Sequence, residues 1–320
     1  MRIQSDNPNG SQSATTDRWG ALSSRLSPAT GLRRGEPLAP HTTLRVGGAA
    51  EVWVEPAAEV DLREVLRFCA ENAIAFLVLG RGSNLLVRDG GIRGVVISLA
   101  HPAFSRVEVD GAVLRCGAGA RLKTVAVEAR RHGLGGMEFL EGIPGSMGGA
   151  LRMNAGAMRS SVFDLVETVR FMDHRGEVSE QASGLIPSEY RGCPFFRNHI
   201  ALGATLRGRP EPVETIRERM EAYSKRRWET QPSQPSAGCV FKNPDGISAG
   251  KLVDELGLKG TRVGGALVSD VHANFIVNDG TATAGDVLAL IEVVRQRAFE
   301  ARGVRLETEV QIVGEDPPAV

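Results

Sequence analysis

The stretch that decides the fold runs from Phe139 to Gly156 and reads FLEGIPGSMGGALRMNAG. Its centre, GIPGSMGG at residues 142–149, crowds glycines around one proline and one serine. Glycine lets the backbone approach a ligand closely, and successive N–H groups can then form a concave nest for phosphate oxygens. The alternative is a tight turn between two packed elements, but a turn needs fewer such residues. We therefore predict that this stretch cradles a pyrophosphate.

Length and composition set the broad class of the protein. At 320 residues the chain is long enough for two or three domains. Apolar residues make up 42% and charged residues 24%, which is ordinary for a soluble globular protein. Lys+Arg and Asp+Glu balance at 38 each, so we expect neither a nucleic-acid nor a membrane partner. No apolar run reaches the roughly 18 residues of a membrane span, and residues 1–20 lack the apolar core of a signal peptide, so a cytoplasmic location is expected.

The cysteines show no CxxC spacing, so we predict neither a zinc site nor a disulfide framework, and we assign no metal. They are Cys69, Cys116, Cys193 and Cys239.

The first part of the chain is predicted to alternate strands and a helix. Residues 1–30 are polar with little to bury, so we expect a disordered tail, with order beginning near Pro37. Residues 51–55 alternate as a strand does, and residues 62–69 carry apolar side chains at i, i+3, i+4 and i+7, as one helix face does. A buried strand at 75–79 ends in the glycine loop Gly80–Asn84, a second candidate ligand loop, and another strand follows at 94–99.

From residue 104 onward the pattern favours strand pairs. Asp110-Gly111 between two short β-type runs predicts a hairpin, and Gly117–Ala120 opens a helix at 122–132. This glycine pair is not a dinucleotide fingerprint, because GxGxxG fails at Leu122, and no P-loop motif occurs in the chain. Further strands are predicted at 166–172, 199–206, 272–278 and 309–313, and helices at 213–228, at 249–256 and after a capping box at Thr283 and Asp286.

Taken together, these motifs resemble the UDP-N-acetylenolpyruvoylglucosamine reductase family over residues 35–314. The matching stretches are Thr43–Gly48, Leu79–Leu86, Gly142–Gly156, Tyr190-Arg191, Gly238–Pro244, His272–Asn278 and Glu309-Val310. One glycine loop alone would be a weak signal. Several motifs in the same order over the whole ordered chain make a specific one.

The resemblance implies an α+β fold and a two-step reaction. The FAD-binding domain, of the vanillyl-alcohol-oxidase (PCMH) type, would span 31–208 in two subdomains, about 31–100 and 101–208, and a C-terminal α/β substrate-binding domain would span 209–320. NADPH would reduce a non-covalent FAD, which would pass hydride to C3 of UDP-N-acetylglucosamine enolpyruvate to give UDP-N-acetylmuramate. The predicted FAD-binding residues are Gly80, Gly82, Ser83, Asn84, Gly117, Gly119, Gly142, Ile143, Pro144, Gly145, Ser146, Gly148, Gly149, Asn154 and Gly156.

The resemblance also assigns the catalytic residues. Hydride addition builds negative charge on the substrate carboxylate, which a guanidinium can grip with two parallel hydrogen bonds, and Arg191 matches that position. Glu309 matches the family's catalytic glutamate, and Glu307 is its rival because strand period places both on one face. Without the motif, each would be read as a surface residue.

Cys239 falls at the proton-donor position, where we expect serine in most members. A free thiol has a pKa of about 8.5 and can donate its proton at neutral pH, although an isolated cysteine is more often a buried packing residue. Gln311, where arginine is common, and Cys193, where we expect serine, depart from the family pattern.

The remaining assignments are contacts to the substrate. They are Tyr190, Lys225, Arg227 and Asn243. The basic run 225–227 could equally be a solvated helix end that complements the macrodipole. The chain has no room for the family's extra tyrosine-bearing loop, so it resembles the shorter type, and we expect a monomer.

Two other functions stay open at this point. One is a different enzyme of the same flavin superfamily, such as a sugar or alcohol oxidase with covalently attached flavin. The other is a flavin- or nucleotide-binding module without catalysis, against which the presence of Arg191 and Glu309 argues.

Overall fold

The computed structural model describes residues 17–318. Within the expected tail, residues 1–16 lie outside the described residues, but the expectation is wrong for residues 17–30. Helix α1 (Arg18–Ser23) buries Trp19 and Leu22, and the Trp19 ring lies 6.4 Å from that of Phe68. Two apolar side chains at i and i+3 are enough to dock one short turn of helix on the first core. Strand β1 (Gly31–Pro37) comes next, so order begins before Pro37.

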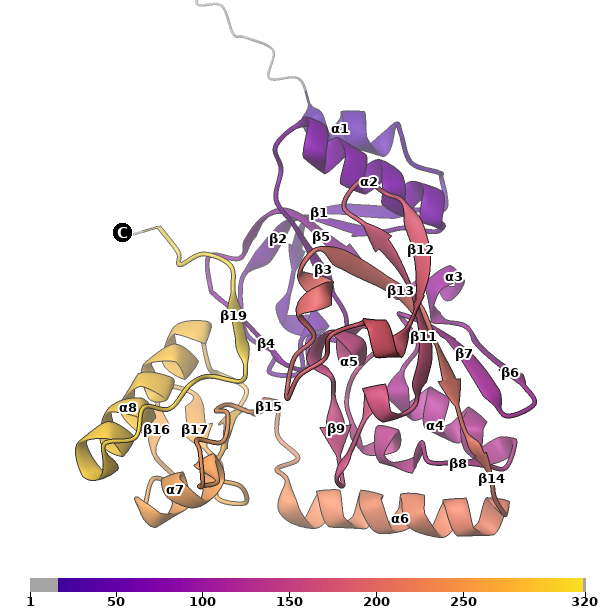
Figure 1. The fold of residues 1–320 in the computed structure, drawn as a ribbon. Helices are drawn as coiled ribbons and strands as arrows, with labels where there is room; N and C mark the ends of the chain where they lie inside the picture. The colour runs from indigo at the N-terminus through magenta and orange to yellow at the C-terminus, as the bar shows by residue number, and fades with distance from the viewer. Residues whose placement is uncertain (1–16, 319–320) are drawn as a thin grey trace, which may run out of the picture.

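The first sheet has the strand order β1-β2-β5-β3 (Figure 1). Strand β2 (Ala49–Glu55) pairs antiparallel with β1 and parallel with β5 (Ile92–Ser98), which pairs parallel with β3 (Phe76–Leu79). The central strand β5 is buried along nearly its whole length, as expected for a parallel strand covered on both faces. Helix α2 (Glu59–Glu71) packs its predicted apolar face into this core.

The second sheet is antiparallel and has the order β12-β11-β13-β7-β6. The Asp110-Gly111 hairpin is confirmed, and Gly111 has the left-handed φ of +57° that such a turn requires. The strands are β6 (Val107–Asp110), β7 (Val113–Gly117), β11 (Val166–Asp173), β12 (Val178–Ala182) and β13 (His199–Arg207). The helices of this part are α3 (Pro102–Ser105), α4 (Leu122–Arg131) and α5 (Met147–Met153), and its short strands are β8 (Leu134–Gly135), β9 (Gly156–Ala157), β10 (Ser160–Ser161) and β14 (Arg209–Pro210).

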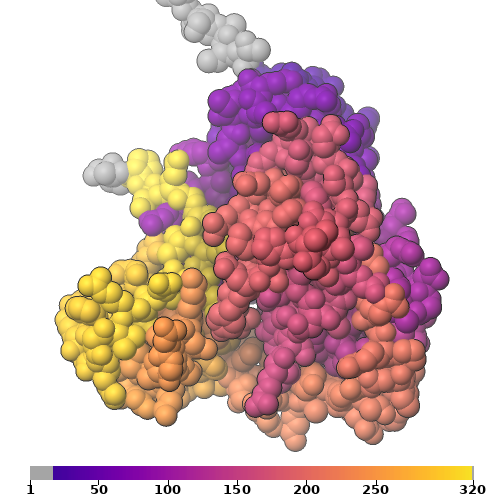
Figure 2. Space-filling view, in the orientation of Figure 1, coloured from indigo at the N-terminus to yellow at the C-terminus, as the bar shows by residue number. Residues whose placement is uncertain are grey.

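The C-terminal part forms a separate lobe, the orange and yellow region at the lower left of Figure 2. Its antiparallel sheet has the order β15-β18-β17-β16, and the predicted capping box of Thr283 and Asp286 starts its longest helix. Its elements are β15 (Ser236–Cys239), α7 (Ala249–Glu255), β16 (Arg262–Val263), β17 (Ala266–Val268), β18 (Phe275–Asn278) and α8 (Ala284–Arg302).

The boundary between the two parts differs from the one expected at residue 209, and each part contributes an element to the other. Helix α6 (Val213–Thr230) packs Ile216 and Met220 into the first core, so it belongs with the first part of the molecule. In the other direction, β19 (Gln311–Val313) returns to pair in parallel with β4 (Leu85–Val87).

Polar contacts also cross between the parts. The Asp89 carboxylate accepts the N–H groups of Ala284 and Gly285 at 2.9 and 2.8 Å, at the start of α8. Such a cap satisfies donors that a helix end leaves free and suits the positive end of its dipole. Within residues 17–318, no helix has both the length and the apolar character needed to span a bilayer.

Candidate active site

A cavity of about 1600 Å³ lies where the two sheets of the first part meet the C-terminal lobe. Its wall draws on the loop after β3, the start of α4, the glycine stretch, the end of α6, the segment 231–236 and the strand β15. The site therefore combines segments from both ends of the sequence. In the described range, no three His, Cys, Asp or Glu side chains come together as metal ligands would.

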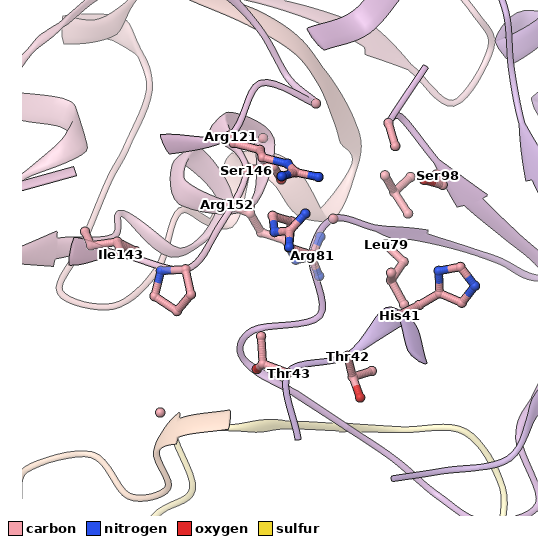
Figure 3. Close-up of a pocket in the computed structure, with 18 of the residues that line it drawn as sticks. His41, Thr42, Thr43, Leu79, Arg81, Ser98, Arg121, Ile143, Ser146 and Arg152 are labelled. Atoms are coloured by element: carbon pink, nitrogen blue, oxygen red, sulfur yellow. The ribbon is translucent and has the colours of Figure 1, made fainter. Parts of the chain in front are cut away.

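Three arginines gather at one end of the cavity beside Ser146: Arg81, Arg121 and Arg152 (Figure 3). Burial, reinforced by the neighbouring Arg121 charge, lowers the pKa of Arg81, and burial together with Arg197 lowers that of Arg152. Cations held close together and partly desolvated form a site for an anion, and a diphosphate matches it in charge. Our sequence reasoning missed these arginines, although Arg81 lies inside the loop that it singled out.

The glycine stretch is built as a 3₁₀ helix (Glu138–Gly142), a four-residue loop and the short helix α5. Part of the predicted N–H nest is used by the protein itself. The N–H of Met147 donates to Ala120 O at 2.9 Å, and that of Gly148 donates to Ala118 O at 2.8 Å. A Cβ on Gly148 would lie 3.1 Å from Ala118 Cβ, so this glycine permits close packing of the stretch on residues 118–120.

Nine of the fifteen predicted FAD-binding residues line the cavity. They are Gly80, Gly119, Gly142, Ile143, Pro144, Ser146, Gly148, Gly149 and Gly156. The others, which are not part of the lining, are Gly82, Ser83, Asn84, Gly117, Gly145 and Asn154. For two of these the structure gives a packing reason: a Cβ would lie 2.5 Å from His41 O at Gly82 and 2.2 Å from Phe104 O at Gly117.

The two asparagines of this group support the predicted catalytic residues from behind. Asn84 Nδ2 donates to the backbone oxygen of Glu309 at 3.2 Å. Asn154 Nδ2 donates to Glu189 O at 3.2 Å, in the turn that carries Arg191. Their contacts link the glycine loops to the catalytic residues across long stretches of sequence.

Arg191 and Glu309 face each other in the cavity wall, with Arg191 Nε 3.1 Å from Glu309 Oε1. Arg191 Nη1 also donates to Gly156 O at 3.2 Å. The φ of Arg191 is +59°, a conformation that side-chain-bearing residues rarely adopt, and the turn that holds it is closed by hydrogen bonds between Glu189 and Gly192. Backbone strain of this kind is concentrated at functional sites.

The structure separates the two rival glutamates. The Glu309 side chain is 13% exposed and contacts Arg191, whereas the Glu307 side chain is 74% exposed and pairs with Lys242 at 3.2 Å. Strand period does not relate them, because β19 begins only at Gln311. Burial raises the pKa of Glu309, and the charges of Arg191 and Lys242 oppose that shift.

Cys239 lines the same wall, half-buried at the end of β15. Burial raises the pKa of its thiol to about 11, and the negative charge of Glu309 adds to the shift, while Arg191 and a hydrogen bond from Asn274 lower it. The thiol is therefore protonated throughout the neutral range, more securely than an ordinary cysteine.

Only some of the residues predicted to contact the substrate line the cavity. Arg227 lines the cavity close to Gly142, whereas Lys225 and Tyr190 lie outside the lining. Lys225 lies 4.0 Å from Glu229, and the exposed Tyr190 ring lies 5.4 Å from the Arg191 guanidinium carbon. The Asn243 side chain accepts the Ala249 N–H at 3.0 Å at the start of α7, which is a structural use of its oxygen.

The residues present fit an FAD. A cavity of this size can hold a dinucleotide, and three clustered arginines match a diphosphate. The glycine wall leaves space on the cavity side, since a Cβ on Gly149 would meet only Ser146 Oγ, at 3.5 Å. A Cβ added there would thus occupy open space at the cavity wall without displacing protein atoms.

We predict that Gly149→Val weakens FAD binding by about tenfold or more, because its methyl groups occupy cofactor space. The unliganded variant should still melt close to the unliganded parent protein. The measurement is the FAD content of purified protein, from its absorbance spectrum, with a titration of added FAD. Gly184→Val is the control, because a Cβ there meets nothing within 4 Å. Full FAD occupancy in Gly149→Val would contradict this placement of the cofactor.

Comparisons with known proteins agree with this architecture. Residues 50–181 match the model of an FAD binding domain, and residues 231–313 match that of the UDP-N-acetylenolpyruvoylglucosamine reductase C-terminal domain. The chain is 45% identical to the UDP-N-acetylenolpyruvoylglucosamine reductase of Geobacter metallireducens, over 88% of this chain and 94% of that protein. It is 42% identical to that of Clostridium botulinum, over 88% and 92%. The crystal structure of the Thermus caldophilus reductase superposes with a TM-score of 0.78 at 38% identity, over 88% of this chain and 99% of the other.

Proposed function

This chain belongs to the UDP-N-acetylenolpyruvoylglucosamine reductases, and on that premise we propose which of its residues carry out each part of the reaction. The enzyme reduces UDP-N-acetylglucosamine enolpyruvate to UDP-N-acetylmuramate, a step of peptidoglycan precursor synthesis, with FAD and NADPH. When bound, FAD supplies the hydride chemistry, accepting hydride from NADPH and delivering it to C3 of the enolpyruvyl group. The protein must bind that group, stabilise the charge that develops on it and protonate C2.

Arg191 binds the carboxylate of the enolpyruvyl group. Its contacts with Glu309 and Gly156 orient the planar guanidinium at the cavity wall before the substrate arrives. A donor fixed in this way stabilises developing negative charge without reorganising during the reaction. The strained backbone at Arg191 is consistent with such preorganisation.

Cys239 donates the proton to C2. Its raised pKa keeps the thiol protonated, and the Glu309 carboxylate contributes to that state. Proton transfer leaves a thiolate, which the Arg191 charge stabilises. Glu309 therefore has two tasks, to hold Arg191 in place and to keep the thiol protonated until the substrate needs the proton.

The observation that carries this proposal is the meeting of Arg191, Cys239 and Glu309, from three distant parts of the sequence, in one wall of the cavity. The test is NADPH oxidation with and without UDP-N-acetylglucosamine enolpyruvate, with UDP-N-acetylmuramate identified by mass. Substrate-independent oxidation at the same rate would contradict it.

The diphosphates of the two nucleotides are the partners we propose for the remaining cations of the cavity. Arg227 lines the cavity and is our proposed contact to the sugar nucleotide, and Lys225, which lies outside the lining, stays a proposed contact. Tyr190 and Asn243 stay proposed contacts to the substrate.

We also propose that the enzyme is a cytoplasmic monomer with non-covalent FAD. Every group of the proposed site comes from one chain, and NADPH is a cytoplasmic reductant. Acid precipitation should leave the yellow colour in the supernatant, and light scattering should give the monomer mass of 34.2 kDa.

Arg191→Lys should slow reoxidation of the reduced flavin by the enolpyruvyl substrate about 10- to 100-fold, because lysine keeps the charge but loses one charge-assisted hydrogen bond of the fork. Reduction of the flavin by NADPH should change much less. Stopped-flow absorbance measures the two half-reactions separately. Equal slowing of both would argue against the carboxylate-binding role.

A further inference from the structure

We propose that Asn274 is a positioning residue for the proton donor. Its side chain holds the turn that carries Cys239 against the segment that carries Glu309. The inference deepens the proposed function and rests on it.

The Asn274 side chain acts as a substitute for a strand partner. It is buried, with 3% exposure, and its Oδ1 accepts the Phe241 N–H at 2.9 Å while its Nδ2 donates to Phe241 O at 2.8 Å. Its backbone oxygen accepts the Val240 N–H at 2.8 Å. The two residues that follow Cys239 are thus bound from the same side by one asparagine.

The Asn274 side chain takes this role because the backbone hydrogen-bond ladder between β15 and β18 is irregular beside Cys239. Ser236 pairs with Val277 but Cys239 pairs with Phe275, so β15 contains one residue more than β18 over this interval. Gly238, inside the interval, has a φ of +78°. An extra residue of this kind bends a strand and re-aims its side chains, often beside an active site. Beyond the bulge the Val240 N–H still donates to Asn274 O, and the Asn274 amide then supplies both hydrogen bonds of the Phe241 backbone.

The other side of the same turn binds the segment of Glu309. Val240 O accepts the Glu309 N–H at 2.8 Å, and the Lys242 N–H donates to Glu307 O at 2.9 Å. Residues 240–242 therefore lie between Asn274 and residues 307–309, and a shift of this turn would move Cys239 and Glu309 relative to each other. Asn274 also lowers the pKa of the Cys239 thiol, against the effect of burial.

The chain offers a matched control in Asn278, four residues later, at the end of strand β18, which Asn274 immediately precedes. It is equally buried, with 3% exposure, and it uses its amide in the same way, donating to Leu44 O at 3.0 Å and accepting the Gly280 N–H at 2.7 Å. These contacts lead to residues 44 and 280 and not to the turn that carries Cys239. Loss of either amide leaves buried backbone groups unpaired at a similar cost, but only Asn274 touches the turn of the proton donor.

The experiment compares Asn274→Leu with Asn278→Leu in the FAD-loaded enzyme. We expect Asn274→Leu to slow flavin reoxidation by the enolpyruvyl substrate about 10- to 100-fold, because misplacement of a catalytic group by an ångström has effects of this size. Flavin reduction by NADPH should be unaffected. Asn278→Leu should melt at a similarly lowered temperature yet keep the ratio of the two half-reaction rates. Equal ratios in the two variants would overturn the inference.

Two further measurements keep the result interpretable. Asn274→Asp retains the acceptor for the Phe241 N–H and loses the donor, so it provides a variant for the same assay if Asn274→Leu does not fold.

Hydrogen exchange of residues 239–242, followed by mass spectrometry, should accelerate in the Asn274 variants and not in Asn278→Leu. Unchanged exchange in the Asn274 variants would count against the inference. Cys239→Ala distinguishes failure of the proposed function from failure of this inference. If flavin reoxidation is normal in Cys239→Ala, the donor assignment fails. If flavin reoxidation is slow in Cys239→Ala but normal in Asn274→Leu, only the positioning role is refuted.

Discussion

Cys239→Ala should leave the flavin reducible by NADPH but slow its reoxidation by the enolpyruvyl substrate about 10²- to 10⁴-fold, the range typical of a lost general acid. Reduction by NADPH needs no proton from this side chain, whereas protonation of C2 does. Because burial raises the pKa of the thiol to about 11, its donor form should be fully populated at neutral pH, so the loss should be visible at any pH from 6 to 9. Anaerobic stopped-flow absorbance gives both rates in one preparation.

Cys239→Ser is the conservative control and should keep substantial activity, because a hydroxyl can donate from the same place. Alkylation offers an independent check, since the other three cysteines are buried. The reagent should block turnover slowly at neutral pH, as expected for a thiol with a raised pKa, and bound substrate should protect. Rapid reoxidation in Cys239→Ala would show that the proton comes from elsewhere, and Glu309 would be the next candidate.

Glu309→Gln should slow the same half-reaction about 10²- to 10³-fold, an effect of the size seen when one preorganised electrostatic contact is removed. The substitution removes the carboxylate that lies 3.1 Å from Arg191 Nε, so the guanidinium loses its orientation and its charge is no longer balanced. Flavin reduction by NADPH should again be much less affected.

Glu309→Gln should also change the pH profile. The Glu309 charge contributes to the raised pKa of Cys239, so removing it lowers the pKa of the thiol. An acid with a lower pKa loses its proton at lower pH, and the fall of the reoxidation rate at high pH should therefore begin earlier than in the parent enzyme. The same profile in both enzymes would show that the two side chains are not coupled.

Glu307→Gln is the matched control for Glu309→Gln. Glu307 is two residues away, has the same chemistry and pairs with Lys242 on the surface, where ion pairs contribute little. We expect turnover close to that of the parent protein. A large loss in Glu307→Gln with a silent Glu309→Gln would reverse the assignment.

Local features of the fold could be predicted from the sequence because they depend on near neighbours. The turn at Asp110-Gly111 requires the positive φ that glycine supplies, and the capping box of Thr283 and Asp286 is formed by residues three apart. The apolar face of α2 and the buried strand β5 follow from periodicity in the same way. The order of the motifs along the chain carried the family resemblance and, with it, the reaction.

Only the tertiary structure decided which side chains meet. Arg81, Arg121 and Arg152 come from different elements, and nothing in their separate surroundings marks them as one anion site. The sequence analysis did not predict helix α1, because this helix is stabilised by packing on distant residues such as Phe68 and not by its own composition. Packing between residues far apart in the sequence determines these features, and the periodicity of apolar residues along the chain contains no information about such packing.

The choice between Glu307 and Glu309 shows, within three residues, the difference between what the sequence determined and what the tertiary structure decided. The sequence predicted a last strand at 309–313 with Glu307 on the same face as Glu309, and the resemblance favoured Glu309. Strand period placed both on one face and therefore could not choose between them. In the structure it does not apply, because their segment lies before β19 begins and is held by Val240 and Asn84. The tertiary structure places Arg191 against Glu309 and leaves Glu307 in solvent, since a contact between residues so far apart in sequence depends on how the two parts of the molecule pack.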